Sequence, residues 1–437
     1  MEKSPSTELR GIKVSPPVQA RVAEGNAVEA RRRFNLGTTF AALKYPNYRL
    51  WFMGQLGSII GTWMQTTAEG FLVFELTHSP AYLGYVGFAA GIPSWFFMLI
   101  GGVVADRFPR RTLILITQTT MMLLAFTSAT LTFTHLIQPW HIVVLAFFLG
   151  IANAFDAPAR QAFVLEMVER EDLGNAIALN STMFQMATVI GPSAAGVTYA
   201  LVGPAWCFTV NGISFLAVIA ALLRMNIKPM PVKAQTRSAL SELAEGLRYV
   251  MGHVYIRTIV GIVVATSLFG LAFATLIPAW SVTILHGDAT TNGLMQSARG
   301  IGALGGALVI ASLGRFRWKG KLLTVGSFVF PISLLIFANI SNTALSLLSL
   351  VVVGWGFMVL FNLANILIQQ MVDDALRGRV MAIYSLTFFG FMPLGALGAG
   401  VVAEHFGEPF TVMLGATISL LVALFVYWRL PQIRALQ

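Results

Sequence analysis

Long apolar runs alternate with short polar connections along most of the chain. Each run reaches or exceeds the ~20 apolar residues that a helix needs to cross the hydrocarbon core of a bilayer. The twelve runs span approximately residues 49–76, 81–105, 112–134, 140–165, 175–202, 205–224, 256–284, 292–313, 321–340, 343–370, 379–403 and 409–428. The pattern predicts an all-α polytopic membrane protein with twelve transmembrane helices.

Basic residues are distributed unevenly over the connections between these runs. Nearly all of them lie in the two tails and in five of the connections. The six connections without Lys or Arg lie near His78, at His135–His141, at Gly203, at His286–Asn292, at Ser341–Thr343 and at Glu404–Glu408. By the positive-inside rule, the five basic connections and both termini are expected to face the cytoplasm.

Composition agrees with this assignment and excludes several others. Of 437 residues, 56% are hydrophobic and 11% are charged, and the mean hydropathy is +0.73. A net charge of +10 also occurs in nucleic-acid-binding proteins, but here the basic residues flank membrane runs, so we expect no nucleic-acid partner. The single cysteine, Cys207, excludes an intrachain disulfide. The histidines lack metal-ligand spacing, and no phosphate-binding motif or catalytic constellation is apparent, so we expect no metal, no cofactor and no enzyme activity.

The runs fall into two similar halves. A shift of 204 residues places Gly150 on Gly354 and Gly191 on Gly395. Duplicated six-helix halves are a transporter architecture, so we predict two pseudo-symmetric six-helix bundles. The expected organisation is a cytoplasmic tail (1–46), a first bundle (47–224), a cytoplasmic linker with an amphipathic helix (225–255), a second bundle (256–428) and a second cytoplasmic tail (429–437).

The loop between the second and third runs carries the most specific motif. It reads Gly101-Gly102-Val103-Val104-Ala105-Asp106-Arg107-Phe108-Pro109-Arg110-Arg111. The pattern G-x-x-x-D-R-x-x-R-R resembles the loop between helices 2 and 3 of major facilitator superfamily transporters. The resemblance implies a gating loop in which Gly102 lets helix 2 approach helix 11 and Asp106 lies near the start of helix 11. It also implies that the arginines, Arg107, Arg110 and Arg111, bind acidic groups on neighbouring helix ends. A cytoplasmic turn that obeys the positive-inside rule would explain the arginines alone.

The fifth run contains a second family signature, Gly191-Pro192-Ser193-Ala194-Ala195-Gly196. It resembles the G-P-x-x-G-G motif of drug/proton antiporters, with one more residue before the last glycine. Proline bends a helix and glycines permit close packing, so ordinary small-residue packing explains much of it. The segment from Ala154 to Gly196 resembles the branch that contains the enterobactin exporter and macrolide-efflux proteins. This resemblance implies a proton-coupled exporter of a hydrophobic or amphipathic small molecule, drug-like or siderophore-like, in a bacterial cytoplasmic membrane.

Polar residues of the first run share one helix face, because they are spaced 3, 4, 3 and 4 residues apart. They are Gln55, Ser58, Thr62, Gln65 and Glu69. Polar groups that face lipid are costly, so this face lines either a water-filled central cavity or a neighbouring helix.

Glu69 is the candidate for proton coupling, because it is an isolated carboxylate at membrane depth. Its possible partner is Arg299 of the eighth run, and a structural ion pair is the alternative role. Many proton-coupled relatives carry an arginine in helix 4, four residues before a glycine. Here Gly150 is preceded at that spacing by Ala146, which directs attention to Glu69.

Further polar residues within the apolar runs are candidates for the substrate cavity. Asp156 and Arg160 are four residues apart in the favourable acid-first order, and they either gate the cavity or contact substrate, or form a plain helix-end pair. Amides at membrane depth also need partners. With Gln65, the amide candidates are Asn180, Gln185, Asn362 and Asn365.

The expected partners are a small-molecule substrate, protons and the lipid bilayer, and we expect a monomer. One alternative function is a lysophospholipid or metabolite carrier. Another is a membrane receptor or scaffold that keeps the fold without transporting.

Overall fold

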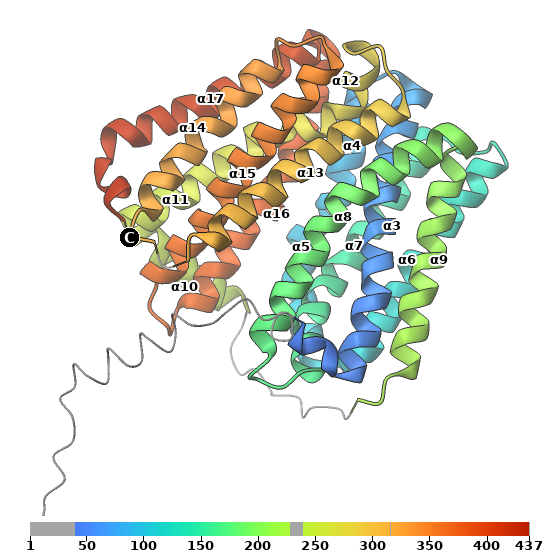
Figure 1. Ribbon diagram of the computed structural model, residues 1–437, viewed down its shortest axis with the longest axis horizontal. Coiled ribbons are helices and arrows are strands. Elements are labelled where there is room, and N and C mark those ends of the chain that lie inside the picture. Colours follow the sequence, from blue (N-terminus) through green and yellow to red (C-terminus); the bar gives the residue numbers. More distant parts are fainter. Residues whose placement is uncertain (1–39, 228–238, 315, 437) are drawn as a thin grey trace, which may run out of the picture.

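The computed structural model describes residues 40–227, 239–314 and 316–436, and all regular structure in these ranges is helical (Figure 1). Most of the predicted N-terminal tail and the first part of the predicted linker, residues 228–238, lie outside the described residues.

The first half of the chain forms six helical spans. They are α3 (Pro46–Thr77), α4 (Pro80–Gly91) continued by α5 (Pro93–Arg107), α6 (Arg110–Phe133), α7 (Pro139–Phe163), α8 (Leu173–Val202) and α9 (Pro204–Arg224). Two 3₁₀ helices, η1 (Ala41–Lys44) and η2 (Val164–Glu166), lie before α3 and after α7.

The second half forms six more spans. The first consists of α11 (Val254–Ala265), the π-helical η3 (Thr266–Gly270), the 3₁₀ helix η4 (Leu271–Leu276) and α12 (Ile277–Thr283). The other five are α13 (Ala289–Ser312), α14 (Lys319–Phe337), α15 (Thr343–Met371), α16 (Arg377–Phe406) and α17 (Glu408–Arg429).

Two of the helices, α3 and α8, are more polar than is usual for a membrane span. In the described ranges, nine helices are long and apolar enough to cross a membrane, or ten when the bent pair Pro80–Phe97 and Ile100–Arg107 counts as one. The helices α3 and α8 are not among them, although they have 32 and 30 residues, because amides and hydroxyls interrupt their apolar runs. Both run beside the other spans (Figure 1), so the helices of the described ranges agree with the predicted architecture of two bundles, and the full count of twelve membrane spans stays a prediction.

Two spans are broken where continuous helices were expected. The predicted run 81–105 is interrupted at Ile92, before Pro93 at the first position of α5, and bends by 57° further on, between the segments Pro80–Phe97 and Ile100–Arg107. The predicted run 256–284 changes from α- to π- and 3₁₀-helical geometry between Thr266 and Leu276.

Two groups of residues mark the ends of the bundle. We call the end with Pro46, Arg107 and Arg224 the basic face, and the end with His78 and His286 the far face. At the far face, His78, His135 and His286 end helices or turns with positive φ values of 49°, 56° and 51°. A residue in the left-handed region stops a helix, so these positions fix the far-face turns.

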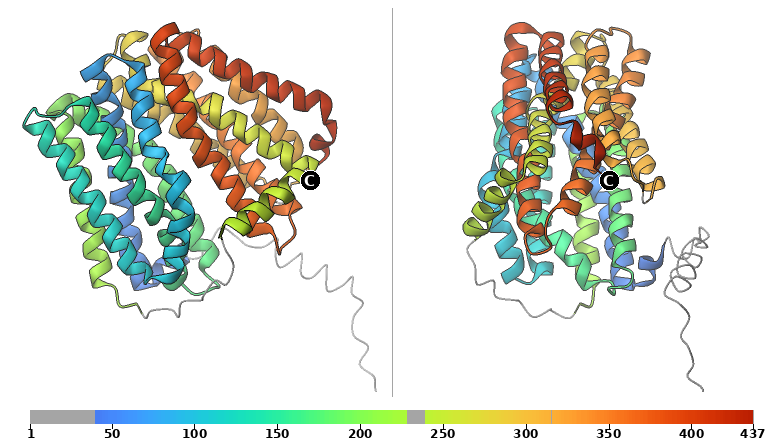
Figure 2. Two further views of the ribbon diagram at one scale, coloured as in Figure 1. Left: turned by 180° about the vertical axis from the view of Figure 1, so that it is seen from behind. Right: turned by 90° about the vertical axis from the view of Figure 1, so that its left-hand side faces the viewer.

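The two halves of the chain form separate six-helix bundles that meet at the far face and diverge toward the basic face (Figures 1 and 2). The apolar core of the first bundle reaches the second one near the far face, where Ala279 of α12 joins Leu72 and Leu83 in a single cluster.

A helix, α10 (Ala239–Gly252), lies within the segment 225–255 that the sequence analysis assigns to the linker. It packs on the start of α16. Gly246 lies against the backbone of Arg379, and Glu245 Oε1 is 2.7 Å from Arg379 Nη1. The linker helix is therefore attached to the second bundle.

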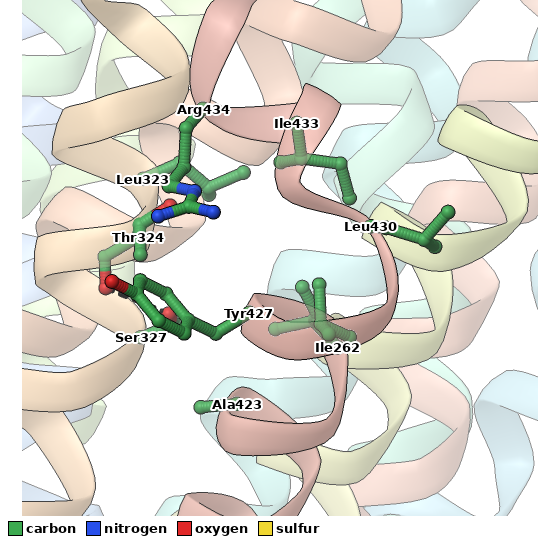
Figure 3. A pocket seen from close by; sticks show the side chains of 10 residues that line it. Ile262, Leu323, Thr324, Ser327, Ala423, Tyr427, Leu430, Ile433 and Arg434 are labelled. Carbon is green, nitrogen blue, oxygen red and sulfur yellow. Dashed lines mark hydrogen bonds between the residues drawn. The ribbon is translucent and has the colours of Figure 1, made fainter.

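The C-terminal segment folds back against the second bundle at the basic face. The 3₁₀ helix η5 (Pro431–Ala435) places the Arg434 guanidinium 4.2 Å from the centre of the Tyr427 ring (Figure 3). The backbone N–H of Gly320 donates to the carbonyl of Leu436 at 3.0 Å. A space of about 10 Å³ remains between these groups, which is enough for about one water molecule.

At the other end of the chain, η1 is held to the start of α8. Lys44 Nζ and the Tyr45 hydroxyl lie 2.7 and 2.8 Å from Asp172 Oδ2. These two hydrogen bonds, that of Lys44 first, hold the pKa of the Asp172 carboxyl below its usual value. The contact therefore favours the charged carboxylate at neutral pH.

Candidate functional site

The contact between α4 and α16 joins the two bundles from the far face inward. A Cβ on Gly84 would lie 2.9 Å from the carbonyl oxygen of Ala396, and one on Gly400 would lie 2.7 Å from Gly84 Cα. Only a residue without a side chain permits this approach. Glycines therefore set the spacing between the bundles here.

A second close contact joins α8 and α13. Ser193 Oγ donates to Ser297 Oγ at 2.6 Å, and Ser297 Oγ donates to the carbonyl of Val189 at 2.6 Å. Of the predicted helix-5 motif, Pro192 and Gly196 lie in this contact, whereas Gly191 packs within the first bundle against Trp63 and Ile60 of α3.

Polar side chains close the far face. The Glu404 carboxylate, at the end of α16, accepts hydrogen bonds from Ser79 Oγ at 2.6 Å and from the Ala81 backbone N–H at 3.1 Å. Asn292 Nδ2 donates to the carbonyl of Thr67 at 3.5 Å. Glu404 thus supplies an acceptor to the first turn of α4 from the opposite bundle.

The basic face has no such closure. Across the described ranges, the hydrogen bonds between the two bundles all lie between the far face and the middle of the helices, where Trp95 Nε1 donates to the Gly390 carbonyl at 2.7 Å. Within the same ranges, no ion pair connects a residue of the first bundle with one of the second. The structure is therefore closed at the far face.

The basic loop is only partly engaged in this conformation. Arg110 Nη1 is 2.9 Å from Glu166 Oε1, and Arg111 Nη2 donates to the carbonyl of Leu223 at 3.1 Å. Asp106 has no ion pair or hydrogen bond to any residue that the structure describes, and a Cβ on Gly102 would meet open space. The implied contacts of Gly102 and Asp106 with helix 11 are thus absent here, and the Arg107 side chain forms no ion pair or hydrogen bond with another described residue. These contacts stay predictions for a conformation that is closed at the basic face.

Asp156 and Arg160 lie in a polar cluster inside the first bundle. Asp156 is 1% exposed, and its Oδ1 accepts hydrogen bonds from Thr117 Oγ1 at 2.7 Å and Gln118 Nε2 at 3.1 Å. Its Oδ2 lies 2.5 Å from Arg160 Nε, within ion-pair distance but outside hydrogen-bond geometry. Arg160 Nη1 also donates to Gln55 Oε1 at 3.4 Å. The burial favours a structural pair over a gate or a substrate contact.

Thr117→Val should destabilise the protein, because it removes a hydroxyl donor from the buried Asp156 carboxylate. A hydrogen bond to a charged group contributes about 1.5–3 kcal/mol, and we expect a loss of that size. The measurement is the midpoint of thermal unfolding in detergent. Thr120→Val is the matched control, since Thr120 is exposed and bonds within its own helix to Ile116. Equal losses in both variants would contradict the assignment.

The polar face of α3 is largely occupied by neighbouring helices. Gln65 is 4% exposed, and its Oε1 accepts a hydrogen bond from Asn211 Nδ2 of α9 at 2.7 Å. Of the two interpretations of this face, the helix contact therefore holds at Gln65, and the water-filled cavity does not. Sequence reasoning missed Asn211, although an amide within an apolar run was the available signal.

Glu69 and Arg299 do not pair in this conformation. Both side chains are partly exposed, and no ion pair within 4.0 Å involves either residue in the described part of the chain. The predicted coupling pair is therefore separated in this conformation, and neither residue has an ion-pair partner among the described residues.

The remaining amide candidates differ in their environment. Asn180 Oδ1 accepts from the Tyr48 hydroxyl at 3.0 Å, so its position is structural. Gln185 Nε2 is buried and has no hydrogen-bond partner among the described residues. Asn365 Oδ1 accepts from Gln369 Nε2 at 2.6 Å, and Asn362, one turn before, is partly exposed. Of these amides, Asn362 is accessible, whereas Gln185 has an unpaired but buried donor among the described residues.

One cavity lies away from the predicted site residues. It has a volume of about 190 Å³, is almost entirely apolar, and lies between η3, η4, α16 and α17. A group of three or more possible metal-ligating side chains does not occur within the described ranges.

Comparison with known proteins supplies the family. A family model described as "Transmembrane secretion effector", within the major facilitator superfamily, matches residues 37–437. The staphyloferrin A transporter of Staphylococcus aureus is 24% identical over 375 residues, which cover 84% of this chain and 92% of that protein. The enterobactin exporter EntS of Citrobacter koseri is 26% identical over 369 residues, covering 81% and 86%. The multidrug efflux pump Tap of Mycolicibacterium fortuitum is 25% identical over 385 residues, covering 86% and 93%.

Solved structures agree on the fold. A D-xylose–proton symporter superposes with a TM-score of 0.71 at 14% identity, covering 90% of this chain and 99% of that one. The nucleoside transporter NupG gives a TM-score of 0.66 at 17% identity, covering 87% and 98%. The sequence match over nearly the whole chain and the two six-helix bundles lead to one conclusion: the chain belongs to the transmembrane secretion effector family of the major facilitator superfamily.

Proposed function

We propose that the protein is a secondary active transporter that exports a hydrophobic or amphipathic small molecule by alternating access. The observation that carries this proposal is the asymmetry of the bundle interface. Close glycine contacts and hydrogen bonds join the bundles at the far face, whereas none of the described side chains bonds across the basic face. A transporter in this arrangement receives its substrate from the basic face.

Two further observations support export as the direction of transport. The positive-inside rule assigns the basic face to the cytoplasm, which places both termini there. The relatives include an enterobactin exporter and a multidrug efflux pump, which favours export. We propose a bacterial cytoplasmic membrane as the location.

Proton coupling is energetically sufficient for this task. A hundredfold uphill gradient costs about 2.7 kcal/mol. One charge that crosses a potential of 100 mV supplies about 2.3 kcal/mol, and a pH gradient across the membrane adds the remainder, at about 1.4 kcal/mol per pH unit. Glu69 is the proposed coupling carboxylate, since it is a titratable group at membrane depth that forms no ion pair with a described residue.

Purified protein in proteoliposomes tests the function. An imposed pH gradient should drive uphill movement of a compound from a drug and metabolite panel, and dissipation of the gradient should stop it. Uphill movement of a lysophospholipid alone would support the carrier alternative. Ligand binding without any movement, downhill or uphill, would contradict transport and favour a receptor or scaffold.

Asp106→Asn should shift the conformational population toward the one described here and slow turnover without lowering expression. The reason is that the carboxylate is unbound in this conformation and is proposed to bind the start of α16 when the basic face closes. The measurement is cysteine accessibility from the far face. Asp374→Asn is the matched control, since Asp374 pairs with Arg377 one turn away. Unchanged transport and accessibility in Asp106→Asn would contradict the role.

A further inference from the structure

We propose that Arg299 binds an anionic group of the substrate, so that the transported molecule is an amphipathic organic anion. This inference rests on the proposed transport function and names the substrate class. It assigns Arg299 a role that does not depend on Glu69.

The position of Arg299 makes its charge unusual. The residue lies near the middle of α13 (Ala289–Ser312), far from the helix ends where basic side chains reach water. A charged residue at the centre of a membrane helix costs roughly 2.5–3.5 kcal/mol on insertion scales. A cation retained at this cost is expected to have an anionic partner, yet no carboxylate among the described residues lies within 4.0 Å.

The helix face on which Arg299 lies points toward the bundle interface. Leu294, Ile301 and Leu308 are spaced seven residues apart and are 44%, 50% and 61% exposed, so they mark the lipid-facing side of α13. Asn292 and Arg299 are also seven residues apart and lie on another side. Asn292 donates to the carbonyl of Thr67 in the first bundle, so this other side looks toward that bundle.

The helices packed around α13 offer no counter-charge inside the membrane. The sequences of α8, α12 and α15 contain no charged residue. On α3, Glu69 is the carboxylate at membrane depth, and it does not pair with Arg299. The anionic partner of Arg299 is therefore expected to be a bound molecule and not a side chain of the protein.

A second donor lies on the facing helix. A Cβ on Gly300 would lie 2.6 Å from the carbonyl oxygen of Thr188, so α8 and α13 touch at the level of Arg299. Gln185 is one turn from Thr188 toward the basic face, and its buried Nε2 has no partner among the described residues. The planar guanidinium of Arg299 matches the two oxygens of a carboxylate or a similar oxyanion, and Gln185 supplies an unpaired amide on the adjoining helix, buried in this conformation.

The inference is tested by measuring the equilibrium binding of two fluorescent probes to the protein in nanodiscs. The probes share one scaffold and differ in charge: dansyl-phenylalanine carries a carboxylate, and its amide is neutral. The wild-type protein should prefer the carboxylate by about ten- to a hundredfold, as expected for hydrogen bonds to a charged group. Arg299→Gln should abolish this preference without weakening binding of the amide. Arg299→Lys should restore part of it, because lysine keeps the charge but not the planar fork.

Two controls separate this role from a structural one. Arg170→Gln removes an exposed arginine of the basic face and should leave the preference intact. Glu69→Gln should also leave it intact, because the two residues do not pair. Arg299→Gln should unfold at the wild-type temperature or above it, whereas a broken structural ion pair would lower that temperature.

Three results would overturn the inference. They are equal binding of the two probes by the wild type, a preference that survives Arg299→Gln, and a lowered unfolding temperature in that variant. Displacement of dansyl-phenylalanine by lysophosphatidate but not by unlabelled N-acyl-phenylalanine would assign the anion to a lipid headgroup. A binding preference without uphill transport would contradict the proposed function but leave the anion site in place.

Discussion

Glu69→Gln is expected to abolish accumulation against a gradient while downhill exchange and ligand binding continue. Glutamine keeps the size and the hydrogen-bonding capacity of the side chain but cannot exchange a proton. Glu69 lies at membrane depth in α3 and is free of ion pairs with the described residues, so it can take up and release a proton without breaking a bridge. The expected result is a complete loss of pH-driven uptake into everted vesicles, with counterflow preserved.

Glu75→Gln is the matched control for this experiment. Glu75 lies on the same helix near the far face, and its carboxylate accepts a hydrogen bond from the Tyr199 hydroxyl, so it is a structural acid. We expect this variant to pump. If Glu69→Gln still pumps uphill with an unaltered pH dependence, Glu69 is structural and the coupling assignment is wrong.

Gly84→Val is expected to hold the far face open and to abolish transport. The first carbon of any side chain at this position would lie 2.9 Å from the Ala396 carbonyl and 3.1 Å from Gly400 Cα, both of which are backbone atoms of the opposite bundle. Overpacking of this kind costs about 1–3 kcal/mol. That cost applies only to the conformation closed at the far face. It therefore shifts the equilibrium between the two conformations by roughly 5- to 150-fold toward the one that is open at the far face.

Gly57→Val is the control for the general effect of replacing a helical glycine by valine. Gly57 is also a helical glycine of the first bundle, but a Cβ there would meet open space within 4 Å. The readout is labelling of single cysteines introduced at the far face by a membrane-impermeant reagent. Labelling should rise in Gly84→Val and stay at the level of the unsubstituted protein in Gly57→Val. Normal transport by Gly84→Val would contradict the proposed closure by α4 and α16.

The helical fold was predictable because its signal is repeated along the whole chain. Apolar length gives each span, and proline at the helix starts together with positive-φ residues at the ends gives the boundaries. The breaks were harder to predict. Pro93 was visible, but proline is tolerated inside α7 and α8, where Pro158 and Pro192 leave the helices continuous. Whether a proline divides a helix depends on its neighbours in space.

The candidate site was only partly predictable, because a polar residue in a membrane run needs a partner and the sequence does not say which one. Gln65 was expected in a cavity but meets Asn211, 146 residues away, and Asp156 meets Thr117, 39 residues away. For Arg299, the sequence did suggest a specific partner, Glu69, but the structure does not pair the two residues. Long-range pairing is set by the packing of the bundles, which local spacing does not encode.

The most direct test of alternating access measures one distance across each face of the same protein. Spin labels replace exposed residues on opposite bundles, Glu171 and Ala375 at the basic face and Leu136 and Ser341 at the far face, after the buried Cys207 is changed to serine. When a transported compound or a pH change alters the population, the basic-face distance should shorten while the far-face distance lengthens. Distances that both stay fixed, or that change in the same direction, would contradict the account.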